Sequence, residues 1–125
     1  MGDGHRLLQV AQHAADLDRD VAFYRDVLGL KLQAVFDPPG LAFFDLGETR
    51  LLLETNAPPA LLYLEVGNID AEHARLVAAG VEFLQGPHLL HRHDGSFAPA
   101  GPEEWMAFFH DSEENLLAIA ERRQS

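Results

Sequence analysis

The stretch Asp16-Leu-Asp-Arg-Asp-Val-Ala-Phe-Tyr-Arg-Asp-Val-Leu-Gly-Leu30 decides how this chain is organised. Its apolar residues recur at the spacing of one helix face: Leu17, Val21, Tyr24 and Leu28. Asp16 is suited to cap the start of this helix, because its carboxylate can accept hydrogen bonds from the free amides of the first turn. Gly29 is suited to end it, because glycine readily takes the left-handed conformation found after helices. With the strand-like run at 30–36, the stretch predicts a capped helix that leads directly into a strand.

The same order of elements occurs twice along the chain. In the first half we expect strands at 6–12, 30–36, 41–45 and 50–54 around the helix. In the second half we expect strands at 61–66, 81–84, 104–110 and 115–120, around a helix that starts at Asn68 and ends at Gly80. A module this short buries its sheet only by pairing with its twin. The sequence therefore predicts one α+β domain over residues 1–125, built from two βαβββ modules at 6–54 and 61–121 around a shared cleft.

Composition limits the partners that the chain can have. It has 125 residues, a formal net charge of −11 and no cysteine. We expect neither nucleic acid nor an anionic membrane as a partner, because both require a basic face. The lack of cysteine excludes disulfides and thiolate chemistry. No signal peptide is evident and no apolar run reaches the roughly 18 residues of a membrane span, so we expect a cytoplasmic protein.

The second half differs from the first by an insertion of about fourteen residues within 85–101. We expect it to form a long loop, and long loops inside compact domains are commonly functional. It contains His88, His91 and His93. On a strand, alternate residues point to the same face, so His91 and His93 would present their imidazoles together. The alternative is a surface loop whose histidines face solvent or the pocket without binding a metal.

Two motifs resemble those of a known family. Asp16-Leu-Asp-Arg followed by Phe23-Tyr-Arg-Asp-Val-Leu-Gly-Leu30 is similar to the first-module signature of the vicinal oxygen chelate superfamily. Trp105-Met-Ala-Phe-Phe-His-Asp-Ser-Glu-Glu-Asn-Leu-Leu117 resembles the closing hairpin of its second module, which usually carries Asp-Pro-Asp-Gly-Asn at the turn. This superfamily includes glyoxalase I, methylmalonyl-CoA epimerase, extradiol dioxygenases and the bleomycin resistance proteins. The resemblance implies a half-barrel sheet around a pocket, in a homodimer.

In the metal-dependent members of this superfamily, ligands for a divalent ion come from the first and last strands of each module. By resemblance, these positions correspond here to Gln9, Glu54, Leu61 and Ala118. Only the first two can ligate a metal, and a stable divalent site usually needs at least three protein ligands. Ala118 also lacks the carboxylate that would transfer protons in the glyoxalase or epimerase reaction. The resemblance therefore does not carry that reaction over to this chain.

Other residues could complete a site. Gln9, Glu54, His91 and His93 together would make a coordination shell for zinc, nickel, iron or manganese. Glu54 is also a candidate catalytic base, because burial among apolar neighbours would raise its pKa. The residues expected to bind a ligand are Gln9, Phe44, His88, His91, His93 and Trp105. The two aromatic residues among them could equally belong to the core.

Two classes of function remain open at this stage. The first is a module that binds a small organic molecule, as the bleomycin resistance proteins do, without the complete metal site. The second is a metal-dependent lyase, isomerase or dioxygenase whose site is rebuilt from the histidines of the insertion. The missing ligands favour the first class. The identity of the small molecule is not encoded in any motif of the sequence.

Overall fold

The computed structural model describes residues 4–92 and 103–123. It consists of eight strands and few helices, in the order βαβββ–βαβββ, so the predicted α+β class and module order are confirmed. The chain forms two compact units. The first contains residues up to Ala60 together with Asp111–Asn115, and the second contains Leu61–His110 and the segment from Leu116 onward.

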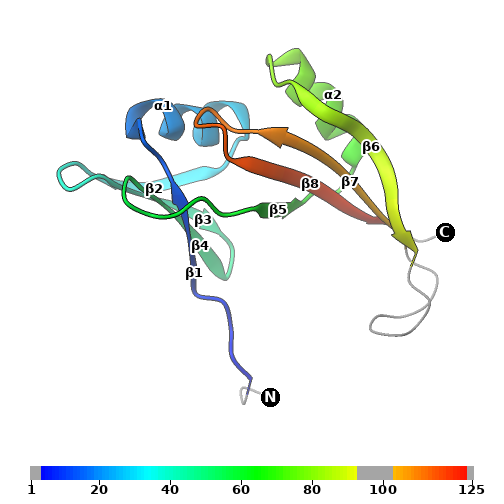
Figure 1. The fold of residues 1–125 in the computed structure, drawn as a ribbon. Coiled ribbons are helices and arrows are strands. Elements are labelled where there is room, and N and C mark those ends of the chain that lie inside the picture. Colours follow the sequence, from blue (N-terminus) through cyan, green and yellow to red (C-terminus); the bar gives the residue numbers. More distant parts are fainter. Residues whose placement is uncertain (1–3, 93–102, 124–125) are drawn as a thin grey trace. The chain divides into compact units, whose positions relative to one another are not determined.

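The sheet of the first unit is covered by a helix on one face (Figure 1). Its elements are β1 (Gln9–His13), α1 (Leu17–Ala22), the π-helical turn η1 (Phe23–Val27), β2 (Lys31–Phe36), β3 (Leu41–Leu46) and β4 (Thr49–Glu54). The strand order is β1-β4-β3-β2, with β1 parallel to β4 and the other pairs antiparallel. The layer between helix and sheet is fully buried and contains Tyr24, Phe44, Leu51 and Leu53.

The second unit repeats this plan. Its elements are β5 (Leu62–Glu65), α2 (Ile69–Ala78), β6 (Phe83–Arg92), β7 (Glu103–His110) and β8 (Leu116–Arg123). The strand order is β5-β8-β7-β6, again with one parallel pair, β5 with β8. Helix α2 contacts β6, β7 and β8 (Figure 1). The buried side chains on this side of the sheet include Ile69, Leu76, Phe109, Leu117 and Ile119.

Both helical segments begin and end near the predicted residues, but the first changes from α-helix to π-helix at Phe23. The Asp16 side chain accepts a hydrogen bond from the backbone N–H of Arg19 at 3.1 Å, and Asn68 caps α2 through the N–H of Ala71 at 3.0 Å. Gly29 and Gly80 follow the helices with φ angles of 81° and 98°. Only glycine adopts these angles without a steric penalty, which explains why the helices stop at these residues.

The insertion in the second module is structured differently from the expected loop. Strand β6 continues to Arg92, which pairs with Glu103 of β7, so residues 85–92 form strand rather than loop. Three irregularities interrupt the register of this pair. The expectation of a strand that ends at 84 was therefore wrong, because the insertion lengthens the β6–β7 hairpin. Residues 93–102 lie outside the described part of the chain.

In the part of the chain that the structure describes, no helix is long and apolar enough to cross a membrane.

Candidate functional site

The second sheet has one face that α2 does not cover. Side chains alternate along a strand, so Ala107 and Phe109 of β7 point toward the helix while Met106 and Phe108 point to the opposite, open face. Tyr63 and Glu65 of β5 pair with Ala118 and Ala120 of β8, and their side chains lie on the same open face. We refer to it as the open face of the second sheet.

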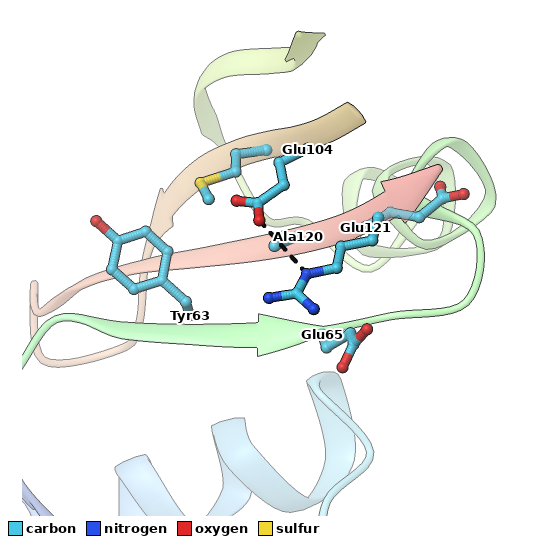
Figure 2. A pocket seen from close by; sticks show the side chains of 7 residues that line it. Tyr63, Glu65, Glu104, Ala120 and Glu121 are labelled. Atoms are coloured by element: carbon cyan, nitrogen blue, oxygen red, sulfur yellow. Dashed lines mark ion pairs between the residues drawn. The ribbon is translucent and has the colours of Figure 1, made fainter. Parts of the chain in front are cut away.

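A hollow of about 250 Å³ lies on this open face (Figure 2). Its lining residues come from β5, β7 and β8: Tyr63, Glu65, Glu104, Met106, Ala120, Glu121 and Arg122. Pockets for drug-sized ligands span roughly 300–1,000 Å³. The hollow is therefore of a size for a small molecule, or for one end of a larger one.

The charged groups of the hollow are not all alike. Arg122 forms an ion pair with Glu104, with 3.4 Å between Nε and the carboxylate oxygen (Figure 2). The Glu121 carboxylate instead accepts a hydrogen bond from the backbone N–H of Ile69 and lies 3.3 Å from Arg123. Glu65 is exposed and has no hydrogen-bond or ion-pair partner in residues 4–92 and 103–123. Glu65 is thus the carboxylate of the hollow whose charge is left uncompensated.

A row of rings extends from the hollow across the open face. The rings of Tyr63 and Phe108 are T-shaped with centroids 6.1 Å apart, and the His88 ring is 6.4 Å from that of Phe108. His88 pairs with Met106, which is a lining residue of the hollow. Its Nδ1 lies 2.9 Å from the carbonyl oxygen of Gly86. Since a carbonyl can only accept, Nδ1 is the donor of this hydrogen bond.

Gln9 and Glu54, the predicted metal ligands of the first unit, are not brought together. Gln9 pairs with Arg50 at one end of the parallel β1–β4 pair, whereas Glu54 pairs with His13 at the other end. Their backbones are therefore separated by about 13 Å along the strands. The Gln9 side-chain oxygen accepts a hydrogen bond from Arg50 Nε at 2.7 Å, so it already has a partner.

The described residues do not fit the divalent metal site of the superfamily. Leu61 and Ala118 offer no ligand atoms at the two corresponding positions of the second unit. Within residues 4–92 and 103–123, no three or more His, Asp or Glu side chains are grouped so that they could hold a metal ion. His93 lies outside the described residues, and of His91 only the backbone, in β6 opposite Glu104, is described. A contribution of these two histidines to a site stays a prediction.

The two aromatic residues predicted to bind a ligand lie away from the open faces. Phe44 is fully buried on the helix-covered side of the first sheet, where its ring contacts Tyr24 with centroids 6.0 Å apart. Trp105 alternates with Met106 and therefore points to the α2 side, where the Arg123 guanidinium lies 4.6 Å from its ring centroid. These positions favour structural roles for both residues, and ligand binding by either one stays a prediction. Phe44 and its neighbour Phe43 are indistinguishable by sequence, and only packing against Tyr24 selects the inner one.

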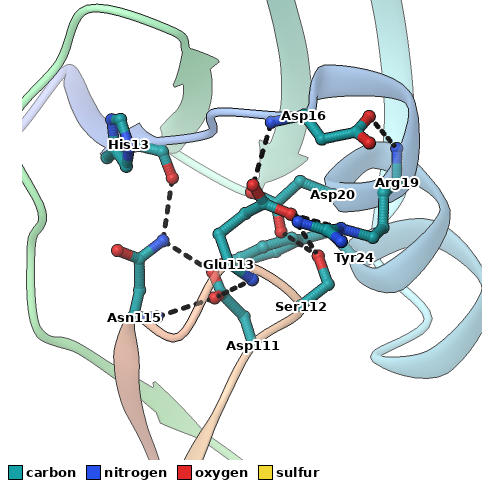
Figure 3. A network of polar contacts seen from close by, with 9 residues as sticks. All are labelled: His13, Asp16, Arg19, Asp20, Tyr24, Asp111, Ser112, Glu113 and Asn115. Carbon is teal, nitrogen blue, oxygen red and sulfur yellow. Dashed lines mark hydrogen bonds and ion pairs between the residues drawn. The ribbon is translucent and has the colours of Figure 1, made fainter.

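A buried polar cluster in the first unit is a second candidate for function (Figure 3). The turn 111–115 lies against α1 and η1, where the Tyr24 hydroxyl donates to Asp111 Oδ2 at 2.7 Å and the Ser112 hydroxyl donates to Asp20 Oδ1 at 2.9 Å. Arg19 binds Glu113 at 2.8 Å. Burial, with a smaller contribution from the Asp111 carboxylate, raises the pKa of Asp20 to about 7. Because Asp20, Tyr24 and Asp111 are buried and the bonds of the cluster anchor the turn, we assign it to structure.

Sequence reasoning missed most of the residues of the hollow. Tyr63 and Glu65 sit two apart on a predicted strand, which would have placed them on one face. Glu104, Met106 and Arg122 join them only through the pairing of β7 with β8 and of β8 with β5, which spacing along the chain does not reveal. Among the predicted ligand-binding residues, His88 pairs with a lining residue, Met106, and its role in binding stays a prediction.

Comparison with known proteins agrees with this architecture. The profile of the Glyoxalase/Bleomycin resistance protein/Dioxygenase superfamily matches residues 6–119. The chain is 27% identical to the uncharacterized protein YraH of Bacillus subtilis (strain 168), over 91% of this chain and 96% of that protein.

Two solved structures with a similar fold have names that state different activities. Lactoylglutathione lyase from Agrobacterium tumefaciens has a TM-score of 0.70 and 24% identity, with 94% of each chain covered. TnmS3, an antibiotic binding protein from Streptomyces sp. CB03234, has a TM-score of 0.72 and 22% identity, covering 98% of this chain and 99% of that one. At this identity the likeness shows the glyoxalase-like fold alone, which confirms the predicted fold class.

Proposed function

Because the chain belongs to the Glyoxalase/Bleomycin resistance protein/Dioxygenase superfamily, we propose that it binds a small organic molecule in the hollow of its second sheet, without the complete metal site of the superfamily. The observation that carries the proposal is the hollow itself, whose lining includes the aromatic Tyr63 and the apolar Met106 and Ala120. Ligand sites typically combine apolar and aromatic walls with a few placed polar groups.

The fold alone does not decide between binding and catalysis, because one fold hosts many functions. The same architecture occurs in a protein named a lyase and in one named an antibiotic binding protein. What favours binding is the local chemistry. Gln9 and Glu54 are far apart along their strands, and Leu61 and Ala118 cannot ligate an ion. Glu54 as a catalytic base therefore has no described metal partner, and that role stays a hypothesis.

A thermal-shift screen with a library of small organic molecules tests the proposal. A ligand at a hundredfold excess over its dissociation constant stabilises the folded protein by about 2.7 kcal/mol, which is readily detected. We expect the shift to be lost in Tyr63→Ala and kept in Leu84→Ala, which removes an apolar side chain that is 62% exposed on β6. Hits that stabilise Tyr63→Ala as strongly as the native protein would place the ligand elsewhere and contradict the proposal.

Elemental analysis of protein purified without chelator or affinity tag tests the alternative. Near-stoichiometric zinc, nickel, iron or manganese that disappears in the double variant His91→Ala/His93→Ala would establish a rebuilt metal site. The protein would then be examined as a metal-dependent lyase, isomerase or dioxygenase. We further expect a cytoplasmic homodimer, and a monomeric mass by light scattering would contradict the dimer.

A further inference from the structure

We infer that the ligand of the hollow is an organic cation with a flat apolar body, whose charged end lies at Glu65, on the same strand face as the Tyr63 ring. This inference rests on the proposed function and adds the chemical class of the ligand. It begins from charge, because Arg122 and Glu104 compensate one another while Glu65 has no partner among the described residues. A cation at Glu65 would supply the missing opposite charge.

An aromatic ring on the same strand face as Glu65 favours the same class of ligand. Tyr63 precedes Glu65 by two residues on β5, so both side chains extend from the same face of the strand. Half of Tyr63 is exposed, at 53%. The faces of aromatic rings carry negative charge and attract ammonium groups at short range. A carboxylate and a tyrosine ring on one face thus form a pair of groups that both prefer a positive charge.

The remainder of the open face suits the apolar part of such a ligand. The rings of Phe108 and His88 continue the row that starts at Tyr63, with centroid distances of 6.1 and 6.4 Å. Met106 adds a flexible thioether, which adapts to irregular ligand surfaces.

The charge of the whole protein acts in the same direction. The formal net charge is −11, and such a field raises the local concentration of cations and lowers that of anions. An anionic ligand would be repelled both by this field and by the unpaired Glu65 carboxylate. We therefore expect the order of affinity cation, then neutral analogue, then anion.

Three indole compounds with one shared ring test this order: tryptamine, a cation at neutral pH; tryptophol, its neutral analogue; and indole-3-acetate, an anion. Each is titrated at millimolar concentration into isotope-labelled protein and followed by amide chemical shifts. We expect the shifts to map to β5 and β8, with tryptamine bound roughly fivefold to tenfold more tightly than tryptophol, as an ion pair and a cation–π contact together supply. Indole-3-acetate should bind most weakly.

A matched pair of variants separates local from global charge. Glu65→Gln should abolish the preference for tryptamine, whereas Glu48→Gln, which removes one carboxylate 82% exposed on the first unit, should leave it unchanged. Equal affinities for the three compounds, an unchanged preference in Glu65→Gln, or no shifts in β5 and β8 with any of them would overturn the inference. The proposed function would survive each of these results if the library screen yields ligands that require Tyr63, so the two failures are distinguishable.

Discussion

Replacing Asp20 by asparagine should stabilise this protein at alkaline pH. The Asp20 side chain is completely buried, and only one of its oxygens has a partner, the Ser112 hydroxyl at 2.9 Å (Figure 3). No other described group binds the second oxygen. Burial, reinforced by the neighbouring Asp111 carboxylate, raises the pKa of Asp20 from 3.8 to about 7. The folded protein therefore favours the uncharged acid at this position.

The sign and size of the effect follow from proton linkage. Between the unfolded pKa near 4 and the folded pKa near 7, the folded state holds a proton that the unfolded state releases. The stabilising contribution of the protonated acid is thus complete below pH 4 and is lost as the pH rises to 7. At about 1.4 kcal/mol per pKa unit, the loss amounts to at most about 4 kcal/mol. An asparagine side chain at this position would carry no charge at any pH, although its amide hydrogens also need partners.

Urea unfolding followed by circular dichroism, at pH 5 and pH 8, measures this difference. We expect Asp20→Asn to raise the free energy of unfolding by about 2–3 kcal/mol at pH 8 and by much less at pH 5. Asp18→Asn is the control, because Asp18 is exposed on the same helix and its loss removes the same charge. It should cost about 0.3–1 kcal/mol through the helix dipole, equally at both pH values. A stabilisation by Asp20→Asn that is equal at pH 5 and 8, or a destabilisation at pH 8, would refute the reasoning.

Two further predictions concern the turn 111–115. Glu114 has a φ angle of 68°, in the left-handed region, so Glu114→Gly should raise the free energy of unfolding by about 1 kcal/mol; an unchanged or lower melting temperature would contradict this. Tyr24→Phe removes the 2.7 Å hydrogen bond to the buried Asp111 carboxylate and should lower the free energy of unfolding by about 1.5–3 kcal/mol in the same urea assay. A loss below about 0.5 kcal/mol would mean that this bond does not anchor the turn.

The parts of the fold that the sequence predicts are those set by local interactions. The cap at Asp16 and the terminating Gly29 depend on residues within one or two turns, and the structure confirms both. The module repeat is visible in the sequence because each half needs the same spacing of apolar residues to cover its own sheet. The length of β6 could not be predicted, because residues 85–92 become strand only by pairing with β7.

The site was harder to predict than the fold, since it depends on register between distant strands. By resemblance, Gln9 and Glu54 are the two ligand positions of the first module. In the parallel register of β1 and β4, however, they lie at opposite ends of the strand pair. Sequence gives no sign of this register. Likewise, Glu65 and Arg122 share the hollow only because β5 lies beside β8.

In each sheet, one face packs against a helix and the other face does not. This difference explains how such a fold can keep its structure while its chemistry changes. The side chains that hold α1 and α2 on their sheets, such as Phe44 and Phe109, all point to the helix-covered side and are completely buried. Tyr63 and Glu65 on the open face of the second sheet are exposed, so replacing them costs little stability. It follows that membership of the superfamily predicts the buried layer, whereas the chemistry of this protein must be sought on its open faces.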